Sequence, residues 1–254
     1  MTHIIAVLNQ KGGVGKTTTT INLAAYLAKP GKSVLVVDLD PQGNATSGFG
    51  INKHEVTGGT YDVLLGKQSL DSAIVPVPNE DGVFIVPTGQ GLAAAELELI
   101  ELTKREYALQ KALSHASHDY IIIDCPPALS LLTVNALTAA SSLLIPVQSE
   151  YYALEGLTQL LEVTQQVRQG LNPKLELLGV LMTMYDSRTS LSEQVKGEVA
   201  QYFGDKLFET VIPRNVRLAE APSHGKAIGS YDKWSKGARA YKQLAREVSH
   251  RLDG

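Results

Sequence analysis

A lysine and a run of threonines directly after a glycine-rich turn are the residues of this sequence best suited to chemistry. Glycines let the backbone curl until several N–H groups point at one anion. Lys16 adds a positive charge, and the Thr17 hydroxyl is placed to ligate Mg²⁺. The pattern predicts a loop that binds the phosphates of a nucleoside triphosphate. The expected contacts are Lys11, Gly12, Gly13, Val14, Gly15, Lys16, Thr17 and Thr18.

The elements on either side of this loop are the ones that a phosphate-binding loop requires. An apolar run at residues 4–8 predicts a strand, and apolar residues at helical spacing over 21–27 predict a helix that stops at Lys29-Pro30-Gly31. The start of that helix would add the positive end of its dipole. A glycine-rich surface turn with two lysines is the alternative, and the order of strand, loop and helix argues against it.

Aspartates end two further apolar runs. Residues 33–38 predict a strand buried on both faces, followed by the segment Asp38-Leu39-Asp40-Pro41-Gln42-Gly43-Asn44. The carboxyl ends of strands in an open α/β sheet are where ligands bind, so these carboxylates can face the phosphates. The alternative is that Asp40-Pro41 forms a plain turn and that Asn44 or Thr46 caps a helix.

The second run, residues 120–124, ends at Asp124 and has the Walker B pattern. A carboxylate in this position holds Mg²⁺, usually through water, so Asp124 is a candidate metal residue. A helix-capping aspartate after a buried strand is the simpler reading of the same residue. Cys125, which follows, is read as a small buried residue rather than a nucleophile.

Strands and helices alternate along the rest of the chain. Further strands are expected at 83–87, 143–147, 175–184 and 208–212, with helices at 131–140, 154–169, 190–203 and 235–252, and short helices and loops over 51–82. This order predicts an α/β fold. We expect a single doubly wound domain over residues 1–254, with a mostly parallel central sheet flanked by helices.

Composition limits the classes of function. With 44% hydrophobic and 19% charged residues, the 254-residue chain has the content of a folded globular protein. One cysteine excludes an internal disulfide and a Cys-x-x-Cys site within one chain. No apolar stretch of membrane-spanning length and no signal-peptide pattern occur, so a cytoplasmic protein is expected.

Basic residues are concentrated near the C-terminus of a chain whose formal net charge is -3. Between residues 214 and 246 there are eight lysines and arginines and two acidic residues. Such a bias fits non-specific binding to a nucleic-acid backbone, where each neutralised phosphate releases counterions. The alternative is an ordinary solvated face.

Two departures from general patterns identify a resemblance. Gln10 occupies the first glycine position of G-x-x-x-x-G-K-[ST] and is followed by a second lysine, Lys11. This loop resembles the deviant Walker A loop of the ParA/MinD family of P-loop ATPases. Residues 213–226 resemble the P-R-N-V-x-L-x-E-A-P-S-x-G segment of its chromosomal ParA/Soj branch. The resemblance covers essentially the whole chain.

The resemblance implies a P-loop NTPase fold, ATP and Mg²⁺ as ligands, and roles for particular residues. Lys11 would reach across a homodimer bridged by ATP to the partner's nucleotide, and Asp40 would position the attacking water. Lys16 would offset phosphate charge, and Asp38 would lie near the Mg²⁺ shell. The adenine base would lie against Pro213 and Asn215, with Met184 nearby.

The function that the resemblance implies is DNA segregation. The ATP-bound dimer would bind double-stranded DNA of the nucleoid non-specifically, and hydrolysis stimulated by a ParB-type centromere-binding partner would release it. The candidate DNA contacts are Arg188, Arg217, Lys226, Lys233, Lys236 and Arg239. Whether the context is a chromosome or a plasmid stays open.

Other functions of related ATPases fit the sequence less well. A MinD-like membrane-associated positioning ATPase would need a terminal amphipathic helix with a wide apolar face, whereas residues 240–252 have the spacing of a helix packed on a sheet. Iron–sulfur relatives place paired cysteines at a dimer interface, and this chain has one cysteine. A non-hydrolysing scaffold would not need Asp40 and Asp124.

Overall fold

A seven-stranded sheet forms the centre of the structure, a computed structural model that describes residues 2–29, 31–89, 91–150 and 155–253. The strand order is β3-β4-β2-β5-β1-β6-β7. All neighbouring strands are parallel except β3 and β4, which are antiparallel. The strands are β1 His3–Val7, β2 Val34–Asp38, β3 Val75–Pro76, β4 Val83–Val86, β5 Tyr120–Asp124, β6 Ser142–Gln148 and β7 Glu176–Thr183. The predicted α/β class and parallel centre are confirmed.

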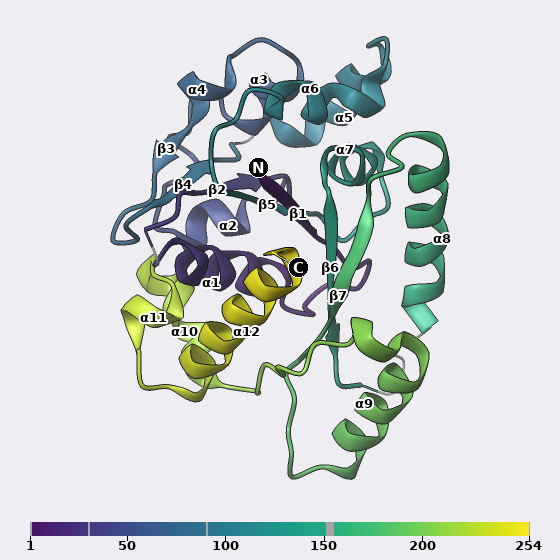
Figure 1. Ribbon diagram of the computed structural model, residues 1–254. Helices are drawn as coiled ribbons and strands as arrows, with labels where there is room; N and C mark the ends of the chain where they lie inside the picture. Colours follow the sequence, from purple (N-terminus) through teal and green to yellow (C-terminus); the bar gives the residue numbers. More distant parts are fainter. Residues whose placement is uncertain (1, 30, 90, 151–154, 254) are drawn as a thin grey trace.

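Helices cover both faces of the sheet, so the fold is doubly wound. Figure 1 shows α1 and α12 lying together on one side of the sheet, with α8 and α9 on the other. The helices are α1 Lys16–Ala28, α2 Asn44–Gly48, α3 Thr60–Leu64, α4 Leu70–Ala73, α5 Leu92–Ile100, α6 Ala108–Leu113, α7 Leu131–Ala139, α8 Glu155–Gly170, α9 Ser190–Phe203, α10 Val216–Glu220, α11 Ile228–Tyr231 and α12 Lys236–Asp253.

Two apolar layers pack against the two faces of the sheet. Successive side chains of a strand point to opposite faces, so Ile5 and Val7 join the layer under α1 and α12 while Ala6 and Leu8 join the other layer. Because both faces are covered, β2 and β5 are buried along their whole length. This burial explains the unbroken apolar runs seen in the sequence.

The C-terminal helix α12 has a purely structural apolar face. Ala238, Tyr241, Leu244 and Val248 are buried in the layer that also contains residues of α1. The Tyr241 hydroxyl lies 3.2 Å from Oγ1 of Thr19 on α1, which gives a polar contact inside this layer. No helix among the described residues is long and apolar enough to cross a bilayer.

The prediction of a strand at 208–212 is wrong. Isolated bridges at Leu207 and Pro213 flank this segment, and the N–H groups of its first and last residues, Phe208 and Ile212, donate to β7 carbonyl oxygens at 2.9 and 2.8 Å, but no continuous ladder forms between them. The N–H groups of Glu209 and Thr210 donate to the Glu247 carboxylate of α12 at 2.8 and 3.0 Å instead of to a strand. The Glu247 side chain of α12 therefore takes the place of a strand partner for these two N–H groups.

Other differences are smaller. The two-residue antiparallel edge strand β3 lies within residues 51–82, where only short helices and loops were expected. Pro30 and Leu154, where one helix was expected to stop and another to begin, lie outside the described residues.

Candidate active site

The register of the parallel strands brings the chemically interesting residues to one edge of the sheet. Asp124 at the end of β5 pairs with Val7 of β1 on one side and with Asp38 of β2 on the other. The glycine-rich loop follows β1 directly, so the loop and both carboxylates meet at the carboxyl ends of three adjacent strands. Sequence order alone does not reveal this adjacency.

The loop after β1 surrounds a cavity of about 610 Å³. Gly13 and Gly15 have φ of 76° and 88°, the left-handed region that favours glycine, and α1 begins at Lys16. The helix therefore starts at the cavity, with its unpaired N–H groups on that side. The lining includes Gly12, Gly13, Gly15, Lys16, Thr17, Thr18, Asp40, Gln42, Asn44, Pro127, Met184, Pro222 and Ser223.

Lys16 is held inside the loop. Its side-chain Nζ donates to the Lys11 carbonyl oxygen at 3.1 Å, and the residue is only 7% exposed. Burial lowers the pKa of Lys16, whereas the nearby carboxylates of Asp124 and Asp40 act to raise the pKa. The ammonium group therefore lies between the loop that would hold phosphate and the acidic cluster.

Asp124 is fully buried and accepts two hydrogen bonds from α1. Thr17 Oγ1 donates to one carboxylate oxygen at 2.7 Å, and Thr20 Oγ1 donates to the other at 3.0 Å. Burial, followed by the charge of Asp38, raises the pKa of Asp124 above its usual range. Sequence reasoning missed Thr20, although it lies three residues after Thr17 on the same face of the helix.

Asp38 organises the segment that follows β2. Its carboxylate accepts hydrogen bonds from the N–H and the hydroxyl of Thr46, at 2.8 and 2.6 Å, and from the N–H of Asp40 at 3.3 Å. The Thr46 hydroxyl also accepts the N–H of Thr88 at 2.9 Å. Burial raises the pKa of Asp38. Asp38 thus ties the loop over 40–46 to the sheet and does not line the cavity.

Asp40 lies at the cavity wall. One carboxylate oxygen accepts the N–H of Gln42 at 2.9 Å, which fixes the side chain in a turn. The other oxygen accepts no hydrogen bond from the described residues, and the residue is 6% exposed. A carboxylate held this way can orient a small polar molecule in the cavity.

The acidic cluster fits a hard divalent cation, although no three acidic, histidine or cysteine side chains in the described part of the chain form a ready-made metal site. Oxygen is the ligand type that Mg²⁺ prefers, and Mg²⁺ usually takes one or two protein ligands plus water and phosphate. Thr17 Oγ1 and the Asp124 carboxylate provide that partial set. Burial, with charge repulsion as a smaller cause, raises the pKa values of Asp38 and Asp124, and a cation there would favour their charged forms.

Lys11 makes an ion pair within its own chain. Its Nζ lies 2.6 Å from Oε2 of Glu150, and the two side chains are 45% and 46% exposed. Gln148 Nε2 donates to the other Glu150 oxygen at 2.5 Å, which holds the carboxylate in place. Lys11 therefore does not line the cavity, and Glu150 was not singled out from the sequence.

The residues predicted to lie near a base occupy one corner of the fold. Met184 lines the cavity, and Thr183 Oγ1 beside it donates to the Val14 carbonyl oxygen of the loop at 2.8 Å. The Arg214 N–H donates to the Tyr185 carbonyl oxygen and the Tyr185 N–H donates to the Ile212 carbonyl oxygen, each at 3.0 Å, which brings Pro213 next to this corner. Pro213 and Asn215 do not line the cavity, but Oδ1 of Asn215 is buried without a hydrogen-bond partner among the described residues.

Comparison with known proteins identifies relatives of this chain. Residues 2–177 match the family described as an AAA domain. The sporulation initiation inhibitor protein Soj of Bacillus subtilis is 55% identical over 251 residues, which cover 98% of this chain and 99% of that protein. The chromosome-partitioning ATPase Soj of Thermus thermophilus is 53% identical over 248 residues, covering 98% and 96%. This chain belongs to the Soj/ParA family of chromosome-partitioning ATPases.

Solved structures agree with membership of the Soj/ParA family. A Mycobacterium smegmatis cobyrinic acid a,c-diamide synthase with bound ADP and magnesium has a TM-score of 0.88 at 39% identity, with 100% of this chain and 96% of that chain covered. The septum site-determining protein MinD of Pyrococcus horikoshii, complexed with Mg-ADP, has a TM-score of 0.81 at 28% identity, covering 100% and 98%. The fold is therefore that of the MinD/ParA P-loop ATPases.

The six basic residues singled out for DNA contact in this Soj/ParA-family chain fall into two groups. Arg188 pairs with Asp186 at 2.7 Å, and Arg217 pairs with Glu220 at 2.9 Å. The other four have no ion-pair partner among the described residues: Lys226, Lys233, Lys236 and Arg239. The second group is free to meet phosphate without first breaking an ion pair.

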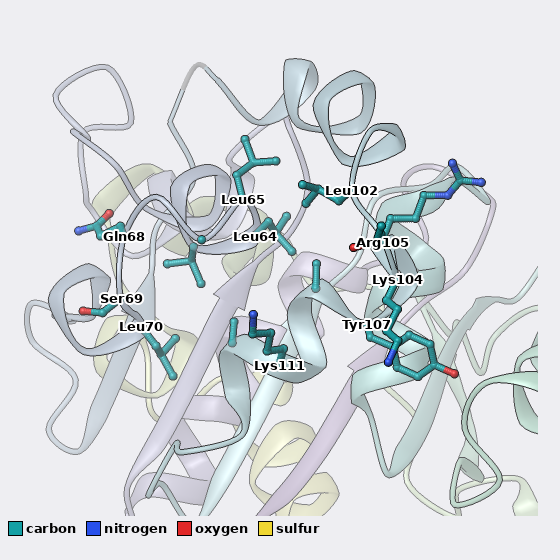
Figure 2. A pocket seen from close by; sticks show the side chains of 15 residues that line it. Leu64, Leu65, Gln68, Ser69, Leu70, Leu102, Lys104, Arg105, Tyr107 and Lys111 are labelled. Atoms are coloured by element: carbon teal, nitrogen blue, oxygen red, sulfur yellow. The ribbon is translucent and has the colours of Figure 1, made fainter.

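A larger cavity, of about 890 Å³, lies away from the loop, between α3, α4 and α6. Figure 2 shows Lys111 pointing toward Leu64, while Arg105 points away from the hollow. Its lining has neither the glycine-rich loop nor an acidic residue. The candidate site is therefore chosen by the residue types that line each cavity and not by cavity volume.

Proposed function

We propose that this protein binds ATP with Mg²⁺ in the 610 Å³ cavity and hydrolyses it as the timed switch of a DNA-segregation system. The observation that carries the proposal is the convergence of the loop, Lys16, Thr17 and Asp40 at one cavity, with the buried Asp124 carboxylate hydrogen-bonded to Thr17 directly behind it. Structures of similar fold with ADP and magnesium, and with an ATP analogue and magnesium, support it.

The chain's own residues account for most of the chemistry. The loop N–H groups and Lys16 bind and orient the phosphates, while Thr17 and Asp124 would hold Mg²⁺, which when bound would offset phosphate charge. The unpartnered oxygen of Asp40 accepts a hydrogen bond from water and aligns it with the γ-phosphate. Little covalent chemistry is asked of the protein, so slow intrinsic turnover is expected.

Lys11 is the residue through which the proposed dimer would form. An exposed ion pair is weak, so Lys11 can exchange Glu150 for the phosphates of a nucleotide bound by a partner chain. Two copies bridged by ATP would double the basic residues Lys226, Lys233, Lys236 and Arg239, with Arg217 next to them through Asp232 and Arg188 as a further contact. Such a surface binds duplex DNA non-specifically through its phosphates. A ParB-type partner would accelerate hydrolysis and release the DNA.

A MinD-like membrane role has less support. The apolar side chains of α12 are buried against the rest of the protein, so this helix has no free apolar face with which to enter a bilayer surface. Sedimentation with anionic vesicles and with duplex DNA, each with ATP, compares the two functions directly.

The test of the proposal is nucleotide-dependent DNA binding measured at several salt concentrations, together with phosphate release. We expect binding with ATP, weaker binding with ADP, and a steep fall with salt. Asp40→Ala should still bind ATP and DNA but release little phosphate, whereas Asp205→Ala, at the opposite edge of the sheet, should behave as the unmodified protein. A protein that stays monomeric with ATP and ignores DNA at low salt would refute the proposal.

A further inference from the structure

The turn between α11 and α12 displays the chain's one tryptophan. Trp234 is 79% exposed, although tryptophan side chains are on average highly buried in folded proteins. The turn begins at Asp232 and ends at Ser235, just before Lys236 opens α12. Neither the cavity nor the apolar layers use this ring, so its exposure needs a separate account.

The backbone on both sides of the ring is fixed. Asp232 accepts the N–H of Trp234 on its carboxylate at 3.2 Å and the hydroxyl of Ser235 on its carbonyl oxygen at 2.9 Å. The Ser235 hydroxyl in turn accepts the N–H of Ala238 at 3.1 Å, in the first turn of α12. A ring presented on an ordered turn loses little conformational entropy when it meets a ligand.

Basic residues lie on both sides of the ring in the chain. Lys233 Nζ lies 5.3 Å from the ring centroid, and Lys236 and Arg239 are exposed in the first turn of α12. Arg217 on α10 reaches the same turn, with its Nε 3.6 Å from the Asp232 carboxylate. An aromatic face amid cations is the combination that binds nucleobases and phosphates together.

We propose that Trp234 stacks on nucleobases, so that this surface binds DNA with unpaired bases more tightly than closed duplex of equal length. The inference deepens the proposed function and rests on it. Cations alone would read only the phosphate backbone, which single strands and duplexes share. The ring adds a contact that is available only where a base is unstacked.

A bilayer surface would also suit a tryptophan beside lysines. It is disfavoured because the neighbouring apolar side chains Ala238, Tyr241 and Leu244 of α12 are buried. A lone ring without an apolar face beside it gives a membrane little to bind.

The experiment uses the tryptophan fluorescence of the full chain, excited at the red edge of the tryptophan band where the ten tyrosines absorb little, so that the signal reports on the single tryptophan, Trp234. With a slowly hydrolysed ATP analogue, oligo(dT) should quench the emission more strongly than a closed duplex does. Trp234→Ala should weaken oligo(dT) binding about 5- to 150-fold, the range for one stacked base. Trp234→Phe should restore most of the loss, and Trp234→Leu should not.

Two controls separate stacking from charge. Tyr202→Ala removes another exposed aromatic ring, 65% exposed on α9, and should leave oligo(dT) affinity unchanged. Lys233→Ala should lower the slope of affinity against salt, whereas Trp234→Ala should leave that slope as it is.

The outcomes distinguish this inference from the proposed function. Duplex binding with ATP but unchanged emission, and equal oligo(dT) affinity in Trp234→Ala, would overturn the stacking contact alone. Binding of neither DNA would overturn the proposed function and the inference with it. A blue shift with anionic vesicles and no response to DNA would assign the ring to a membrane surface and overturn the inference.

Discussion

The ion pair between Lys11 and Glu150 gives a quantitative prediction about dimer formation. In the free chain Glu150 holds the lysine that the proposed dimer needs at the partner's nucleotide. Glu150→Gln keeps the size and polarity of the side chain but removes its charge. Each chain that enters the dimer would then no longer have to break this ion pair.

The size of the expected gain in dimer stability follows from the exposure of the Lys11 and Glu150 side chains. Both side chains are nearly half exposed, at 45% and 46%, and an exposed ion pair contributes roughly 0.2–1 kcal/mol. A dimer contains two such lysines, so the gain is about 0.4–2 kcal/mol, a dimer roughly 2- to 30-fold tighter. The effect should shrink at high salt because exposed pairs are screened.

Sedimentation velocity with Mg²⁺ and a slowly hydrolysed ATP analogue measures this change. Glu98→Gln is the matched control, since Glu98 makes a similarly exposed pair with Lys67 at 2.8 Å, away from the loop. In a Lys11→Ala background Glu150→Gln should have no effect. An unchanged or weaker dimer in the single variant would show that Glu150 does not restrain Lys11.

Three further predictions concern the loop, the C-terminal helix and acid stability. Thr183→Val removes the 2.8 Å hydrogen bond to the Val14 carbonyl oxygen and should weaken binding of an ATP analogue, measured by calorimetry, up to about tenfold. Thr164→Val loses a similar hydrogen bond on α8 and should leave this affinity unchanged. Arg251→Lys should lower the free energy of unfolding in urea by about 1–3 kcal/mol, because the Arg251 guanidinium donates to the Leu178 and Leu207 carbonyl oxygens. Arg246→Lys, at an exposed position of the same helix, is the control. Equal stability of the two variants would contradict the reasoning. Burial lowers the pKa of His118, so the folded state binds its proton less readily than the unfolded state, and stability should fall as pH drops below about 6.5. Urea unfolding at neutral and mildly acidic pH should show a smaller loss for His118→Gln, and an equal loss would count against this assignment.

The sequence by itself was sufficient for features that depend on neighbouring residues. A glycine-rich turn between an apolar run and a helix produces converging N–H groups wherever it occurs, so the phosphate loop and Lys16 could be recognised locally. Unbroken apolar runs with short helical connections likewise predicted a parallel sheet covered on both faces. These inferences required no knowledge of which strands are neighbours.

Only the tertiary structure decided which distant groups meet. The register of β2, β5 and β1 places Asp38 beside Asp124, and strand order is set by packing over the whole chain. The partners Thr183, at the end of β7, and Glu150, two residues after β6, lie far along the sequence. The Glu247 carboxylate of α12 binds backbone N–H groups within the segment 208–212, where a strand was expected. Hydrogen bonds and ion pairs act over a few ångströms of space, so their partners follow from the folded arrangement and not from sequence spacing.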